Sequence, residues 1–114
     1  MVAVLLIESE APVLRLMGWG LMEEGFQVRA VPSPEEAISV LESYQPDFIV
    51  FNTPLPTEAC RRAVESLRAR TPRAKILDVS PSPDGNARDT GADGYIDYPP
   101  RVEDVVAFIR RSET

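Results

Sequence analysis

Polar side chains follow several short, mainly apolar runs of this 114-residue sequence, and their types could do chemistry. Carboxylates and amide oxygens are ligands for hard cations, and hydroxyl groups hydrogen-bond to anions. The amide of Asn52, at the end of "DFIVF", is the unusual member because it is neither an acid, a base nor a nucleophile. The residues that follow these runs are Glu8, Ser9, Glu10, Asn52, Ser80 and Tyr98.

Each of these side chains also has a purely structural interpretation. We interpret Asn52 as a support for its loop, because Asn commonly bonds nearby backbone at turns. Glu8 and Glu10 could hold a cation together with the carbonyl oxygen of Asn52. We favour solvated carboxylates at the start of a helix, where the dipole stabilises negative charge. We therefore expect no bound metal and no cofactor.

The composition gives little support to an enzyme. The chain has no His and a single Cys60, which comes close to excluding a zinc site or a Cys–His catalytic pair. We find no nucleophile with a base to activate it. The net charge of −6 argues against direct binding to nucleic acid or to anionic lipid.

Length and hydropathy predict a single cytoplasmic domain over residues 1–114. No apolar stretch approaches the roughly 20 residues of a membrane-spanning helix. The N-terminus lacks the basic start and the cleavage site of a signal peptide. A second, DNA-reading domain has no room in this chain, so we expect the protein to act through another protein.

Strand-like and helix-like segments alternate along the chain. Such an alternation predicts right-handed crossovers and a parallel sheet with helices on both faces, and its working site lies at the carboxyl ends of the strands. The predicted strands are 2–7, 26–31, 48–51, 75–80 and 95–97. The predicted helices are 12–24, 33–43, 57–70 and 101–111.

Two sets of charged residues lie within these predicted elements: one acidic residue in a strand and a group of basic residues in and after the third helix. Asp78 falls in a predicted central strand, where a carboxylate is costly unless it reaches solvent or is paired with Lys75 or an Arg. We favour a paired structural role over a functional acid. The third helix and its exit could dock an acidic partner or form a solvated face, and both interpretations stay open. Its basic residues are Arg61, Arg62, Arg68, Arg70, Arg73 and Lys75.

Four segments together resemble the receiver domain of response regulators, the CheY-like family. They are "LLIESE", "QPDFIVFNTPLP", "AKILDVSP" and "GADGYIDYPP", in order and at near-normal spacing. The resemblance implies a doubly wound five-stranded parallel sheet with strand order 2-1-3-4-5. It also implies an aspartyl-phosphate site at the strand ends, with Tyr95 at the position of the switch aromatic and a cis peptide bond before Pro99.

The chain departs from that family at the phosphorylation site. The family holds Mg²⁺ with an acidic pair and the acceptor Asp, and a Lys neutralises the phosphoryl group. Here the acidic pair corresponds to Glu8 and Ser9, the acceptor position is Asn52, and the Lys position is Tyr98, while Ser80 is retained. We therefore predict a degenerate pseudo-receiver that does not autophosphorylate at this site.

The segment between Ser80 and Gly91 is short for the family's fourth helix and contains two prolines and a glycine. We expect a shortened or missing helix there. The hypothesis is a signalling module that binds another signalling protein independently of phosphate, and a homodimer stays open. The alternative is a sensor of small ligands or anions. The candidate partner surface comprises Tyr95, Tyr98 and Arg101, or Arg61, Arg62 and Arg68.

Overall fold

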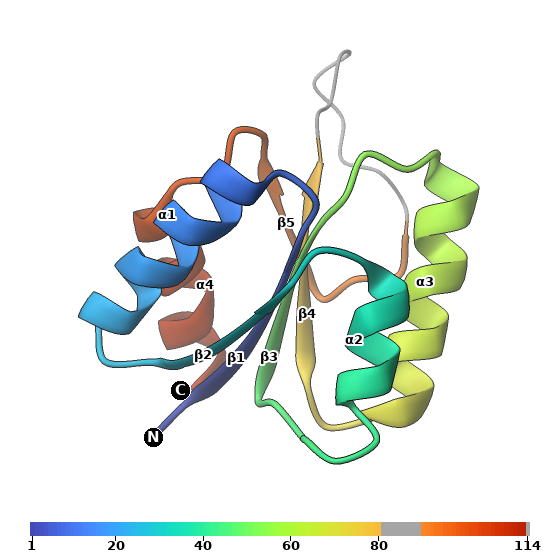
Figure 1. The fold of residues 1–114 in the computed structure, drawn as a ribbon, viewed down its shortest axis with the longest axis horizontal. Helices are drawn as coiled ribbons and strands as arrows, with labels where there is room; N and C mark the ends of the chain where they lie inside the picture. The colour runs from blue at the N-terminus through green and yellow to red at the C-terminus, as the bar shows by residue number, and fades with distance from the viewer. Residues whose placement is uncertain (81–89, 114) are drawn as a thin grey trace.

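The structure is a computed structural model that describes residues 1–80 and 90–113, with Ser80 described by its backbone alone. Its strands form one parallel sheet in the order β2-β1-β3-β4-β5 (Figure 1). The strands are β1 (Ala3–Glu8), β2 (Gln27–Val31), β3 (Phe48–Asn52), β4 (Lys75–Ser80) and β5 (Gly94–Asp97). The helices are α1 (Ala11–Glu23), α2 (Pro34–Val40), α3 (Thr57–Arg70) and α4 (Val102–Ser112).

Helices cover both faces of the sheet, α1 and α4 on one side and α2 and α3 on the other (Figure 1). Strands β1 and β3 are therefore buried along their whole length. Alternate strand residues enter two separate cores, since successive side chains point to opposite faces. The core beside α1 and α4 includes Val4, Leu6, Val50, Leu77 and Ile109. The core beside α2 and α3 includes Leu5, Ile7, Phe51, Ile76 and Leu67.

Local sequence signals mark several ends of these helices. Ser33 caps α2, because its hydroxyl oxygen accepts a hydrogen bond of 3.2 Å from the backbone N–H of Glu36. The regular helix ends at Val40 and continues as turns, so it is shorter than the predicted 33–43. Gly25 follows α1 with φ of 96°, a conformation that other residues rarely adopt.

The predicted fold class and strand order are confirmed. The Tyr98–Pro99 peptide bond is cis, as expected. The expected shortening of the family's fourth helix concerns residues 81–89, which lie outside the described residues. Within the described part of the chain, no helix is long and apolar enough to cross a lipid bilayer.

Candidate functional site

A cavity of about 250 Å³ opens at the carboxyl ends of β1 and β3. Parallel strands end at the same edge of the sheet, so residues far apart in sequence meet there. The cavity is lined by Glu8, Ser9, Glu10, Asn52, Thr53, Pro54 and Tyr98. The structure thus brings together all but one of the side chains that sequence placed at the strand ends. The exception is Ser80. Its backbone pairs with Asp97 at the end of β4, and its side chain lies outside the described part of the structure.

Asn52 and Glu8 form the centre of this site. They are register partners at the ends of β3 and β1, and both are buried, at 6% and 3% exposure. The Asn52 amide N–H donates to Glu8 Oε1. Asn52 therefore links β3 to β1 through the Glu8 carboxylate. The sequence analysis had predicted instead that Asn52 bonds the backbone of its own loop.

Glu8 differs from its expected state. The sequence suggested a solvated carboxylate at a helix start, but Glu8 is the last residue of a covered strand and is buried. Its second oxygen, Oε2, accepts a hydrogen bond of 3.0 Å from the backbone N–H of Glu10. The side chain of Glu10 is exposed, as that interpretation predicted. The correction arises because β1 extends one residue beyond its apolar run and carries Glu8 inward.

The site has a negative electrostatic character. Burial raises the pKa of Glu8, although the hydrogen bonds from the Glu10 backbone and Asn52 oppose that rise. Tyr98 is partly exposed, and its hydroxyl donates to Glu10 Oε2 over a long 3.5 Å. The negative charge of Glu10, followed by desolvation, raises the pKa of the Tyr98 phenol. No Lys or Arg is among the described residues that line the cavity.

The donor set fits the family's Mg²⁺ poorly. Mg²⁺ requires near-octahedral oxygen ligands and favours carboxylates. Here position 9 is a Ser, and the amide of Asn52 directs an N–H group, which cannot ligate a cation, at the Glu8 carboxylate. The described residues contain no group of three or more His, Cys, Asp or Glu side chains placed to hold a metal ion.

Thr53 is a site residue that the sequence analysis missed. It follows Asn52, lines the cavity and is 4% exposed. Its hydroxyl oxygen has no hydrogen-bond partner within the described chain. A buried hydroxyl without a partner is costly, but this oxygen has almost no accessible surface, so a ligand in the cavity does not reach it without a rearrangement. The only signal in the sequence was a polar residue directly after a buried strand.

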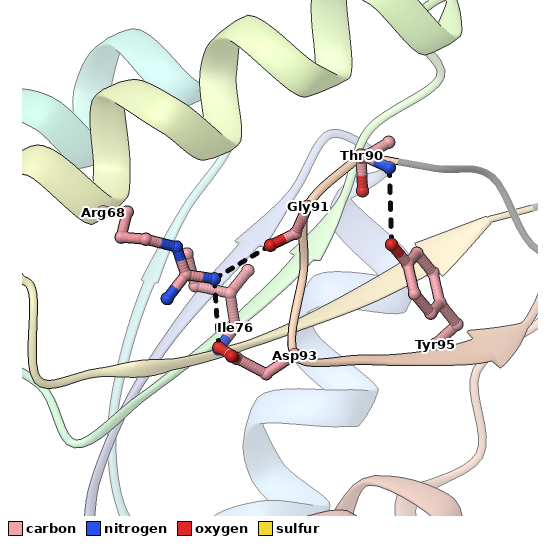
Figure 2. Close-up of polar contacts among 6 residues, drawn as sticks. All are labelled: Arg68, Ile76, Thr90, Gly91, Asp93 and Tyr95. Carbon is pink, nitrogen blue, oxygen red and sulfur yellow. Dashed lines mark hydrogen bonds and ion pairs between the residues drawn. The ribbon is translucent and has the colours of Figure 1, made fainter.

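A second polar cluster, shown in part in Figure 2, fixes Tyr95 at the β4–β5 edge. The backbone N–H of Thr90 donates to the Tyr95 hydroxyl over 3.3 Å. The hydroxyl of Thr90 donates to Asp78 Oδ2 over 3.0 Å. Asp78 is fully buried, so the alternative in which it reaches solvent is wrong. Thr90 is thus a hydrogen-bonding partner of Asp78 other than the basic residues that the sequence suggested.

The candidate basic surface on α3 is partly used within the molecule. Arg68 bonds the carbonyl oxygen of Gly91 at 3.0 Å and Asp93 Oδ2 at 3.1 Å (Figure 2). Arg68 therefore links α3 to the entry of β5, and its place in a partner surface stays a prediction. Arg61, half-buried, contacts Glu58. Arg62 is exposed.

Arg101 belongs to the other candidate surface, beside Tyr98. It is exposed and lies 3.4 Å from Glu103 and 3.8 Å from Asp104. Ion pairs of this exposed kind contribute little to stability and reopen easily. Arg101 therefore remains accessible to a partner.

Helix α1 carries an exposed apolar stripe that sequence analysis also missed. Leu16, Trp19 and Met22 are 69%, 63% and 53% exposed. A shallow groove of about 470 Å³ is lined by Pro12, Arg15, Leu16 and Trp19. The sequence contained a signal for this exposed stripe. Apolar residues lie around most of the circumference of α1, so some of them must face away from the core.

The sequence model of the response regulator receiver domain matches residues 4–110 of this chain. The chain belongs to this family. The receiver domain is 27% identical over 113 residues to the phosphate regulon transcriptional regulatory protein PhoB of Escherichia coli K12. That match covers 94% of this chain and 49% of PhoB. The chain thus spans about half the length of the curated relatives it matches.

Solved structures share the fold of this receiver domain. A CheY-like receiver domain from Methylobacillus flagellatus has a TM-score of 0.82 at 20% identity, covering 97% of this chain and 98% of that one. The response regulator TrrA, solved in complex with the histidine kinase ThkA, has a TM-score of 0.80 at 18% identity, with 97% of both chains covered. Family membership assigns the receiver domain to two-component signalling.

Proposed function

We propose that this receiver domain is a pseudo-receiver, a non-enzymatic module that signals through phosphorylation-independent binding to another protein. The observation that carries the proposal is the state of residue 52. Its side chain is an amide whose N–H donates to Glu8 Oε1. An amide has no anionic oxygen to attack phosphorus, so an aspartyl phosphate cannot form there.

The surroundings of Asn52 add to this argument. An incoming phosphoryl group is anionic and needs positive charge to neutralise it. The position that carries Lys in the family is Tyr98, and the described lining of the cavity contains Glu8 and Glu10. The electrostatic field of the cavity therefore opposes the entry of phosphate.

The cluster around Tyr95 supports a conformation that does not depend on phosphate. Thr90 bonds both the Tyr95 hydroxyl and the buried carboxylate of Asp78. These hydrogen bonds exist within the unmodified chain, so Tyr95 has an orientation without a phosphoryl group to set it. Any change of state would come from differential binding by a partner.

The partner that we propose is a signalling protein of a two-component pathway, such as a histidine kinase, the class that TrrA contacts in its solved complex. Three surfaces could bind it: the Tyr95–Arg101 region, the basic α3 face and the apolar stripe of α1. Exposed apolar groups with a Trp among them are typical of partner-binding surfaces, so we favour α1. We propose neither nucleic acid nor a membrane as a direct partner.

A phosphodonor experiment tests the proposal. The protein is incubated with acetyl phosphate and Mg²⁺, next to a receiver domain that retains the acceptor Asp, and both are followed by intact mass. We expect an adduct on the control alone. A phosphoryl adduct on this chain, mapped to the strand-end cavity, would overturn the proposal.

The second candidate function is a sensor that binds a small ligand in the same cavity. The specific observation in its favour is the cavity itself, about 250 Å³ in volume, whose lining includes the neutral polar residues Ser9, Asn52 and Tyr98. The anion version of this alternative loses support, because Glu8 and Glu10 line the cavity. Thermal-shift screening against neutral and cationic metabolites tests it, since a ligand of the native state raises Tm by mass action.

A further inference from the structure

We propose that the exposed face of α1 is a homodimer interface, in which a second copy of this chain packs its own α1 antiparallel to the first, with Trp19 at the two-fold axis. The dimer goes beyond the proposed function, since it requires neither a phosphoryl group nor its absence. It covers the surface that we favour for a signalling partner, so the second copy and that partner compete for α1.

An exposed apolar stripe on α1 is the first feature of this interface. Five large hydrophobic side chains are exposed in the described chain, and three of them lie on α1: Leu16, Trp19 and Met22. Residues three apart on a helix are neighbours on its surface, so these three side chains form one continuous stripe. Exposed apolar groups that gather in this way are typical of protein–protein interfaces.

Opposite charges at the two ends of the stripe are the second feature. Arg15 and Glu23 lie immediately outside it, one at each end, and both are exposed. Within the described residues neither takes part in an ion pair, whereas the adjacent Glu24 lies 3.9 Å from Arg110. The fold itself therefore leaves a cation and an anion on this face for an interaction with another molecule.

The symmetry of the pattern identifies that molecule as a second copy. Leu16 and Met22 lie three residues on either side of Trp19, and Arg15 and Glu23 lie four residues on either side of it. A two-fold axis at Trp19 therefore places Arg15 of each copy level with Glu23 of the other, and Leu16 level with Met22. An acidic or a basic partner would match only one end of the stripe, whereas a second copy matches both.

A shallow groove beside the stripe receives an apolar side chain in this arrangement. The groove has a volume of about 470 Å³, and Met22 of the second copy lies at its level. An unbranched Met side chain adapts to such an irregular gap. The groove is lined by Pro12, Arg15, Leu16 and Trp19.

The size of the contact predicts a weak dimer. One helix face is at the low end of interface sizes, so we expect a Kd of about 100 µM. Below that concentration the chain is monomeric, and α1 is free for a signalling partner.

Sedimentation equilibrium over a range of protein concentrations tests the proposal. We expect the average mass to rise from the 12.6 kDa of one chain toward twice that value as the concentration passes about 100 µM. Trp19→Ala should weaken association tenfold or more, because a Trp at the centre of the interface is lost from both copies. A chain that stays monomeric at about 1 mM, or a dimer that Trp19→Ala leaves intact, overturns the proposal.

Charge exchange tests the antiparallel arrangement. Arg15→Glu places like charges opposite each other at both ends of the interface, so it should weaken association about tenfold. The double variant Arg15→Glu, Glu23→Arg restores both ion pairs and should dimerise like the native chain. Both changes place each charge nearer the helix end where the dipole favours it, so α1 stays stable. A double variant that does not recover association overturns the antiparallel dimer.

Arg62→Glu is the matched control, because it makes the same change in net charge at an exposed Arg on α3. It should leave association unchanged. Equal losses in Arg15→Glu and Arg62→Glu would overturn the proposal, since net charge alone would then explain them. A monomeric chain without a phosphoryl adduct would remove the dimer and leave the pseudo-receiver standing, whereas a dimer that accepts a phosphoryl group would do the reverse.

Discussion

The pairing of Glu8 with Asn52 shows how one amide changes the chemistry of a strand end. Two buried carboxylates in register would repel each other unless a cation lay between them. An amide at position 52 removes one charge and supplies an N–H donor to the other carboxylate. The pair is therefore stabilised within the protein itself, which is the physical basis of the proposed loss of phosphotransfer.

Restoring the acceptor alone should not restore phosphorylation. We expect Asn52→Asp to give no phosphoryl adduct with acetyl phosphate and Mg²⁺, since Ser9 and Tyr98 still lack the groups that hold metal and phosphate. At neutral pH the variant should lose about 1–3 kcal/mol of unfolding free energy, because the buried Glu8 loses its donor and gains a like charge. Intact mass and urea unfolding measure the two effects.

The triple variant Ser9→Asp, Asn52→Asp, Tyr98→Lys is the positive counterpart, and it should label. Robust labelling of the single variant would show that the acceptor carboxylate is sufficient. If the triple variant folds but gives no phosphoryl adduct, residues other than 9, 52 and 98 must prevent phosphorylation.

Glu8 should make the stability of the fold depend on pH. Burial raises its pKa above the ordinary 4.5, so the folded chain holds the proton of this carboxyl group more tightly than the unfolded chain does. The stability associated with this group is full below its unfolded pKa and is lost as pH rises through the folded pKa. Glu8→Gln cannot ionise, so its unfolding free energy relative to the native sequence should increase from about pH 4 to about pH 7.

Urea unfolding across that pH range measures the difference. Glu42→Gln, at an exposed carboxylate, is the matched control and should give a flat difference. A flat difference for Glu8→Gln as well would contradict the effect assigned to burial.

At the scale of elements, the contact between α1 and α4 depends on a missing side chain. A Cβ atom at Gly20 would lie 2.6 Å from Val102 Cγ2, well inside van der Waals contact. Gly18, in the same helix, would place its Cβ 3.9 Å from Val28 and 4.0 Å from Leu6, which is ordinary packing. Gly20 therefore permits the close approach of the two helices, while Gly18 does not limit it.

This difference predicts opposite effects for two similar substitutions. Gly18→Ala should raise the unfolding free energy by up to about 1 kcal/mol, because Ala favours the helix. Gly20→Ala should lower it by about 1–3 kcal/mol, because α4 must shift or Val102 must move. Denaturant unfolding of both variants measures the effects. An equal gain in both would mean that α4 moves aside at negligible cost.

At the scale of the whole molecule, the features that face outward lie on different elements. The acidic cavity lies at the ends of β1 and β3, the apolar stripe on α1 and the exposed Arg62 on α3. The stripe is the surface with the least role in the fold, because its large side chains contribute little to the core. The receiver fold therefore has a surface available for a partner without using the phosphorylation site.

Trp19→Ala should separate binding from stability. Trp19 is 63% exposed, so its loss should change the unfolding free energy by no more than about 0.5 kcal/mol. If α1 binds the partner, affinity should fall tenfold or more, about the loss expected for a Trp at the centre of an interface. Titration against the histidine kinases of the same cell measures it. A large loss in Arg62→Ala with none in Trp19→Ala would assign the interface to α3.

The sequence by itself determined the sheet, its order through the family resemblance, and the meeting of Glu8, Ser9, Asn52 and Tyr98 at one edge. These features follow from local periodicity and from the rule that parallel strands end together. Tertiary structure decided the burial of Glu8, the donor that Asn52 provides, the partnership of Thr90 with Asp78 and the internal use of Arg68. Each of these features depends on which side chains meet across strands and helices. Residue types and their spacing do not say which residues far apart in sequence come into contact.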